Sequence, residues 1–275
     1  MKHALAMFGL LLPGLVNACI NADHPRYEEY QITRVTEPLL ASLNTTPEDR
    51  FANHHDAPVD DFTKLQREAI EKIRFGKYEG AIKQLNAIEK QFPGQYETAA
   101  NLGTAYELAG KNHAALKWIQ EGVERNAHSH AGSEWIHVNI LEAKIKLEQD
   151  PDYLSTNKVL ALKDSIILEN HVAVNNAEIP VEEVTRMIHY QLQERMVFIK
   201  EDDPVVADLL FTMADLYETQ ELLGVSQKVL ELSKRFAPDQ MQSMNGSNSW
   251  RSLNERQSPG SILGAVFSEP ESCSR

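Results

Sequence analysis

The feature that most constrains the fold of this chain is a pattern of small and apolar residues that recurs after 34 positions. The matched pairs are Gly76 with Gly110, Ala81 with Ala115, and Leu85 with Ile119. Several pairs of residues that match in size at one fixed offset are hard to obtain by chance. A period of roughly 20–50 residues indicates a repeat architecture in which each unit is one supersecondary element.

Each unit is predicted to be a pair of antiparallel helices. Apolar residues recur at helical spacing on both sides of the turn Phe75-Gly76-Lys77. Pro93 ends the second helix and turns the chain into the next unit. Gly103 and Ala115 are small enough to let the two helices of a pair approach closely. One hairpin cannot bury its apolar face alone, so the units are expected to stack into a solenoid.

The residues Ala99-x-x-Leu102-Gly103-x-x-Tyr106, together with the 34-residue period, resemble tetratricopeptide repeats. A further match starts at about Ala207 and fills the same positions in order, with Leu210, Met213, Ala214, Tyr217, Ser226, Leu230, Ser233 and Pro238. A degenerate unit around Trp135 departs from the pattern at Asp150-Pro151-Asp152. The resemblance implies an all-α solenoid of antiparallel helix pairs that binds another protein.

The segments outside the repeats are assigned from their composition. Leu154 to Leu168 is predicted to be a helix, Asn170 to Glu178 a polar loop, and Pro180 the first turn of another helix. After Pro238 the chain becomes rich in serine, which predicts a disordered tail. The expected organisation is a signal peptide over 1–18, a flexible segment over 19–59, repeats over 60–148, a helical middle segment with degenerate repeats over 149–203, a C-terminal repeat over 204–238 and the tail over 239–275.

The N-terminus has the layout of a secretory signal peptide. Lys2 and His3 precede an apolar run over residues 4–16, and small residues follow at Ala18 and Cys19. The run of about 13 residues is too short to span a hydrocarbon core of roughly 30 Å as a helix. The alternative is a buried N-terminal helix, but the layout favours export.

Two forms of processing fit this leader. Leu15-Val16-Asn17-Ala18-Cys19 resembles the lipobox of bacterial lipoproteins, in which the cysteine is acylated, although its asparagine and valine depart from the usual pattern. Ordinary cleavage after Ala18 or Ala22 also satisfies the small-residue rule. Lipidation of Cys19 would anchor the protein to a membrane, and Ile20 is not the residue that retains such proteins in the inner membrane. The expected location is the periplasm, either free or anchored to the outer membrane.

Charge and motifs argue against several classes of function. The net charge is −13 and no long basic run occurs, which argues against binding to nucleic acid. His54-His55-Asp56 lacks the spacing typical of zinc ligands and is expected to be a linker. His128, His130 and His137 are expected to be surface residues. The sequence has no G-x-S-x-G elbow, phosphate-binding loop or nucleophilic cysteine motif, so no catalytic, cofactor or metal residue is assigned and the protein is not expected to be an enzyme.

The resemblance also implies a set of partner-binding positions on the concave side, formed by the first helix of each pair. These positions hold Gln66, Arg67, Ile70, Arg74, Glu97, Asn101, Thr104, Glu107, Glu134, Trp135 and Val138. The mixture suits an extended or helical peptide with basic and apolar side chains, although Ile70, Trp135 and Val138 could instead be packing residues. Chaperone-binding repeats hold a carboxylate with a clamp of Lys, Asn and Arg. Here Asn101 matches, but the other clamp positions hold Gln66, Ile70, Ala131 and Trp135, so that clamp is absent.

Two functions remain open on the sequence alone. The first is an adaptor or scaffold in the bacterial cell envelope that binds a peptide or partner protein on the concave face. The second is a structural subunit of an obligate envelope complex. An enzyme that uses the middle segment is the least favoured reading.

Overall fold

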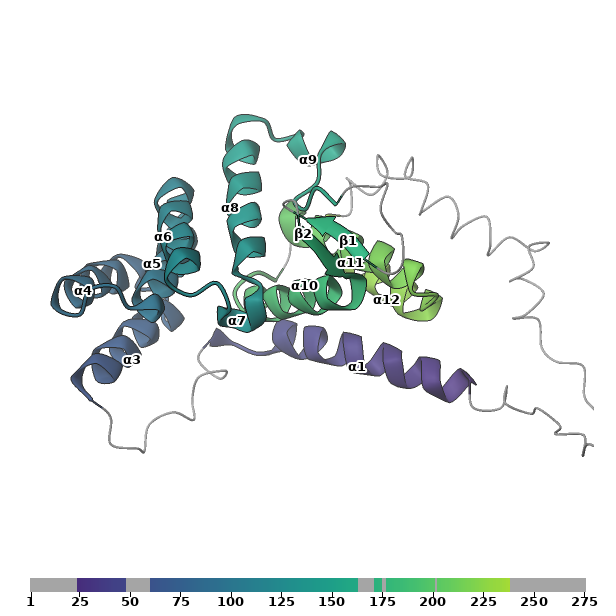
Figure 1. Ribbon diagram of the computed structural model, residues 1–275, viewed down its shortest axis with the longest axis horizontal. Coiled ribbons are helices and arrows are strands. Elements are labelled where there is room, and N and C mark those ends of the chain that lie inside the picture. Colours follow the sequence, from purple (N-terminus) through teal and green to yellow (C-terminus); the bar gives the residue numbers. More distant parts are fainter. Residues whose placement is uncertain (1–23, 48–59, 163–170, 175–176, 201, 238–275) are drawn as a thin grey trace, which may run out of the picture.

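The computed structural model describes residues 24–47, 60–162, 171–174, 177–200 and 202–237. Within these ranges the protein is an all-α fold of packed helix pairs, as the sequence predicts, with one small β-hairpin (Figure 1). The predicted signal peptide, the predicted lipobox with Cys19, the His54-His55-Asp56 cluster and the serine-rich segment after Pro238 lie outside the described residues. No helix among the described residues is long and apolar enough to cross a membrane.

The first part of the fold, which we call the repeat lobe, spans residues 60–149. Its helices are α3 (Asp61–Arg74), α4 (Tyr78–Gln91), α5 (Tyr96–Leu108), α6 (Asn112–Arg125) and α8 (Glu134–Gln149). Each of the first four of these helices packs against the next one in this order, as in a helical solenoid. Asp60 caps α3 by accepting a 2.7 Å hydrogen bond from the Thr63 amide. Gly76 and Gly110 close the two matched turns with φ values of 68° and 73°, which explains why the repeat keeps glycine there.

Gly103 makes the close approach between α5 and α6 possible. A Cβ atom added there would lie 2.3 Å from Cδ1 and 2.5 Å from Cγ1 of Ile119, a fully buried side chain. We therefore expect Gly103→Ala to lower the free energy of unfolding by about 1–3 kcal/mol. This overpacking outweighs the helix preference of alanine, which favours it over glycine by about 1 kcal/mol.

Urea unfolding followed by circular dichroism checks this expectation against Gly80→Ala. Gly80 lies in α4, and an added Cβ would meet only Lys72 Cδ at an ordinary 3.7 Å. That control should be neutral or more stable by up to about 1 kcal/mol. A Gly103→Ala protein as stable as the wild type would show that α5 and α6 do not approach as described.

The third helix pair of the repeat lobe is incomplete. Over residues 150–162, the described stretch that directly follows α8, the chain forms the short helix α9 (Tyr153–Thr156) and is not helical from residue 157 onward. The helix predicted from Leu154 is therefore wrong over this stretch. The cause is a long-range contact: the buried carboxylate of Asp208 accepts a 2.8 Å hydrogen bond from the Val159 amide and pairs with Lys158 at 3.2 Å.

The remaining elements form what we call the C-terminal lobe. They are α1 (His24–Asn44), β1 (His171–Val174), β2 (Ala177–Pro180), α10 (Val181–Arg195), α11 (Pro204–Thr219) and α12 (Leu223–Ser233). The C-terminal helix pair that the sequence predicts is α11 and α12. It packs with α1 and α10 around a common apolar core. α10 begins at Val181 with Pro180 as its N-cap, one position later than the sequence predicts.

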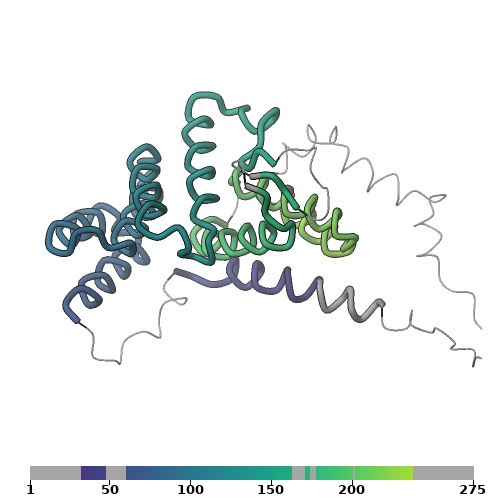
Figure 2. Tube along the Cα trace, in the orientation of Figure 1, coloured from purple at the N-terminus to yellow at the C-terminus, as the bar shows by residue number. Residues whose placement is uncertain are grey.

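Two predictions for this lobe are wrong. Residues 24–44 lie within the stretch expected to be flexible, yet they form α1, whose Val35, Leu39 and Leu43 are buried against α10 and α12. Figure 2 shows α1 alongside helices that follow it by more than a hundred residues. The expected polar loop contains an antiparallel hairpin, in which Val172 pairs with Ile179 and is buried. The buried residues of α1 have their partners on helices more than a hundred residues away, whereas the hairpin pairs locally and contacts α10, which follows it directly.

Candidate functional site

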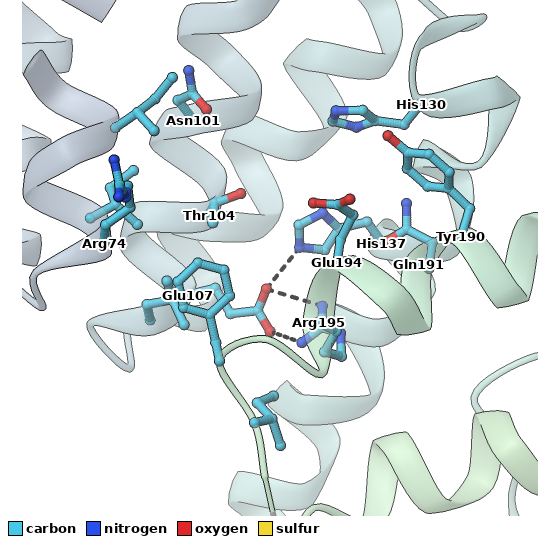
Figure 3. A pocket seen from close by; sticks show the side chains of 15 residues that line it. Arg74, Asn101, Thr104, Glu107, His130, His137, Tyr190, Gln191, Glu194 and Arg195 are labelled. Carbon is cyan, nitrogen blue, oxygen red and sulfur yellow. Dashed lines mark hydrogen bonds and ion pairs between the residues drawn. The ribbon is translucent and has the colours of Figure 1, made fainter. Parts of the chain in front are cut away.

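A pocket lies where the C-terminal lobe meets the inner helices of the repeat lobe (Figure 3). Its volume is about 220 Å³. The lining residues on α3 and α5 are Ile70, Ile73, Arg74, Asn101, Thr104, Glu107 and Leu108, and those that follow α6 are His130, His137, Tyr190, Gln191, Glu194, Arg195, Phe198 and Ile199. Helix α10 and the residues just after it thus form the wall opposite α3 and α5.

The pocket gathers part of the partner-binding set that the sequence predicts. Of that set, Ile70, Arg74, Asn101, Thr104 and Glu107 line it. They come from one face of α3 and one face of α5, as a concave surface requires.

The other six predicted residues do not line the pocket. Gln66 is buried and donates a 2.5 Å hydrogen bond to Thr98 while accepting one from Asn101 at 3.0 Å. Trp135 and Val138 pack against apolar cores, and Glu134 is buried. The last two, Arg67 and Glu97, are half-buried and exposed, respectively.

Beneath the pocket lies a buried ion cluster centred on Glu107. Its carboxylate accepts two hydrogen bonds from Arg195 on α10, at 2.6 and 3.2 Å, and one from Lys144 at 2.9 Å. His137 Nε2 lies 2.7 Å from the same carboxylate. Burial alone would raise the pKa of Glu107, but the charge of Arg195 and the hydrogen bond from His137 outweigh it, so its pKa lies well below the ordinary value. The cluster therefore joins the two lobes through an ionised carboxylate.

His137 belongs to the interior, contrary to the expectation of a surface histidine. It is 8% exposed, and its Nδ1 faces Glu134 at 3.7 Å while Nε2 faces Glu107. Burial lowers the pKa of the imidazole, but hydrogen bonds with the two carboxylates raise it by more than burial lowers it. The net shift of the pKa is therefore upward. Burial likewise opposes ionisation of Glu134, yet bonds from His130 and His137 hold its pKa far below the ordinary value. A cationic His137 bridging two carboxylates is the favoured state.

His130 lies in the turn between repeats and is exposed, as predicted, and it makes several side-chain contacts there. Its φ is 47°, and Ala131 and Gly132 follow with φ of 59° and 74°, so three consecutive residues of α7 (Ser129–Gly132) are left-handed. Non-glycine residues in this region cost about 1–3 kcal/mol each. The conformation is held by several contacts: His130 Nδ1 pairs with Glu134 and lies 3.1 Å from the Tyr96 hydroxyl, and the ring stacks on Tyr190 at 5.7 Å.

Sequence reasoning missed the contribution of α10. Its apolar residues, Val184, Ile188 and Leu192, face the C-terminal core, whereas Tyr190 and Glu194 line the pocket on the other side. The spacing of four between Tyr190 and Glu194 marks a polar helix face. This spacing predicts that α10 has a polar face, but it does not predict that this face lies opposite α3 and α5.

The carboxylate at the pocket floor is already paired. Arg195, His137 and Lys144 all contact the oxygens of Glu107. Among the described residues, no group of three or more His, Cys, Asp or Glu side chains could hold a metal ion. No protein-family model matches the sequence, and no curated protein matches it.

Proposed function

We propose that this protein is an exported adaptor of the tetratricopeptide type in the bacterial cell envelope, which captures a short segment of a partner protein in the pocket between α5 and α10. The observation that carries the proposal is the pocket itself. It lies on the face where the repeat pattern predicts partner contacts, and five of the predicted contact residues line it.

The size and chemistry of the pocket define what it holds. A volume of about 220 Å³ admits one or two side chains of a partner. A whole helix cannot lie against α3 and α5 here, because α10 already occupies the concave face. Five apolar residues, Ile70, Ile73, Leu108, Phe198 and Ile199, supply a surface for an apolar anchor. Apolar pockets with a few convergent polar groups are the usual form of a specific ligand site.

Filling the pocket tests the proposal. Thr104→Trp places an indole in the cavity, and we expect it to weaken peptide binding by at least about tenfold, the loss typical of an interface anchor. Random peptides displayed on phage are selected on the wild-type protein, and synthetic versions of the enriched peptides are titrated by calorimetry.

Lys117→Trp is the matched control, because Lys117 is exposed on α6 outside the pocket. It adds the same side chain and should leave the affinities unchanged. Failure to enrich any peptide, or equal binding to the Thr104→Trp protein, would overturn the proposal.

A further inference from the structure

We propose that the protein carries a second binding site, a groove over α8, and that this site takes an α-helix of a partner protein whose first residue is a carboxylate. The groove has a volume of about 450 Å³ and shares no lining residue with the pocket between α5 and α10. The inference goes beyond the proposed function and does not depend on it.

Three parts of the chain form the groove. Its floor is a stripe of α8 that includes Asn139, Ala143 and Lys146, at intervals of four and three residues. One wall is α6, with His113, and the other is the stretch of chain that includes Ala161. α8 lies between α6 and α9, and the groove runs over it (Figure 1).

The groove continues an interface that the repeat lobe uses twice. α4 packs on both α3 and α5, and α6 packs on both α5 and α8. The 34-residue period places the next helix of this series at residues 146–159, beside α6 and on α8. That stretch instead holds the end of α8, the short helix α9 and non-helical chain. A helix from a partner protein can therefore take the place that the chain leaves open.

The far wall of the groove is held away from that place by α11. Asp208 of α11 accepts a 2.8 Å hydrogen bond from the Val159 amide and pairs with Lys158 at 3.2 Å. Both Val159 and Lys158 line the groove. The groove is thus formed before a ligand arrives, and preorganisation of this kind lowers the cost of association.

The side chains along the groove favour a negatively charged ligand. Lys146, Lys158 and His113 line it, against one carboxylate, Glu142, among the described lining residues. Lys146 is exposed, and its side chain forms no hydrogen bond or ion pair with another described residue. The side chain of Lys158 is 40% exposed although it pairs with Asp208. The lining departs in this way from the acidic character of the chain, whose net charge is −13.

The preceding helices show where the charge of the ligand belongs. Lys111, the N-cap of α6, donates to Glu79 in the first turn of α4. The residue 34 positions after Glu79 is His113, so a lysine at the start of the next helix has no carboxylate to meet there. An aspartate at that position suits His113 and Lys146, and it also caps the helix that carries it.

The test titrates two labelled helical peptides with the full-length protein and follows their fluorescence anisotropy. The first copies residues 111–125, the helix that fills the preceding place, with Lys111→Asp at its start. A hydrocarbon staple joins positions 120 and 124, which are exposed on α6. The second peptide keeps Lys111 and is otherwise identical. We expect the aspartate peptide to bind at least about tenfold tighter at about 50 mM salt, and the difference to shrink at about 500 mM.

Two variants of the protein locate the binding. Ala161→Trp places an indole in the groove from an exposed, non-helical position and should weaken binding of the aspartate peptide by at least about tenfold. Lys146→Glu should bring the affinities of the two peptides to within about threefold of each other. It changes an exposed side chain and carries the test should Ala161→Trp not fold. Lys83→Glu, at an exposed position of α4 outside the groove, is the matched control and should keep the wild-type preference.

The outcomes separate this inference from the proposed function. Thr104→Trp fills the first pocket, so peptide binding that it abolishes, and that persists in Ala161→Trp, would overturn the inference. Equal binding of the two peptides to the wild type, or no binding of either, would also overturn it and leave the proposed function intact. Self-association of the protein in sedimentation that Ala161→Trp abolishes would place a second copy in the groove and exclude the partner helix.

Discussion

Replacing Glu107 by alanine is expected to lower the free energy of unfolding by about 3–5 kcal/mol, the loss that follows when one partner of a buried ion pair is removed. Arg195 is buried and would lose the carboxylate that accepts its two hydrogen bonds, and the buried His137 would keep only Glu134 as a counterion. Lys144 would add a third positive charge at the same point. Because Arg195 lies on α10 and Glu107 on α5, the loss should also loosen the contact between the two lobes.

Urea unfolding measures this effect, with Glu97→Ala as the control. Glu97 lies on the same helix but is exposed, so its removal should change stability by less than about 0.5 kcal/mol. Glu107→Gln separates charge from packing, because it keeps the shape of the side chain and loses the charge. A loss of less than about 1 kcal/mol in Glu107→Ala would show that the cluster is not buried as described.

The parts of the fold that follow from local pattern were predictable. The turns at Gly76 and Gly110 and the small residue Gly103 each serve a contact within 34 positions, so a single repeat carries their signal. The concave positions Asn101 and Thr104 follow from the same spacing.

The rest of the site depends on contacts that no local pattern encodes. Arg195 meets Glu107 across 88 positions, and nothing in the sequence around either residue indicates the other. Asp208 keeps residues near Val159 from becoming helical across 49 positions. α1 was missed for a similar reason. Its buried residues, Val35 and Leu39, are spaced as in a helix, but their partners lie on α10 and α12.

The free energy of unfolding should depend on pH, and on the alkaline side we expect His137 to make the largest contribution to that dependence. A histidine with a raised folded-state pKa contributes stability below its unfolded value of about 6.5 and loses it as pH rises through the folded value. Glu107 and Glu134 have depressed pKa values, so their contribution is present above about 4.3 and is lost as pH falls through the folded values. Both contributions coexist between about pH 4.5 and 6.5, where we expect the maximum.

Above that window the free energy of unfolding should fall with a slope of up to about 1.4 kcal/mol per pH unit for one proton. Urea unfolding between about pH 5 and pH 9 measures the slope, and the difference between wild type and His137→Gln isolates the contribution of this imidazole. His113→Gln, at an exposed position on α6, is the matched control and should keep the wild-type slope. If the free energy of unfolding of His137→Gln falls with pH as steeply as that of the wild type, the contacts of His137 with Glu107 and Glu134 are not the source of the pH dependence.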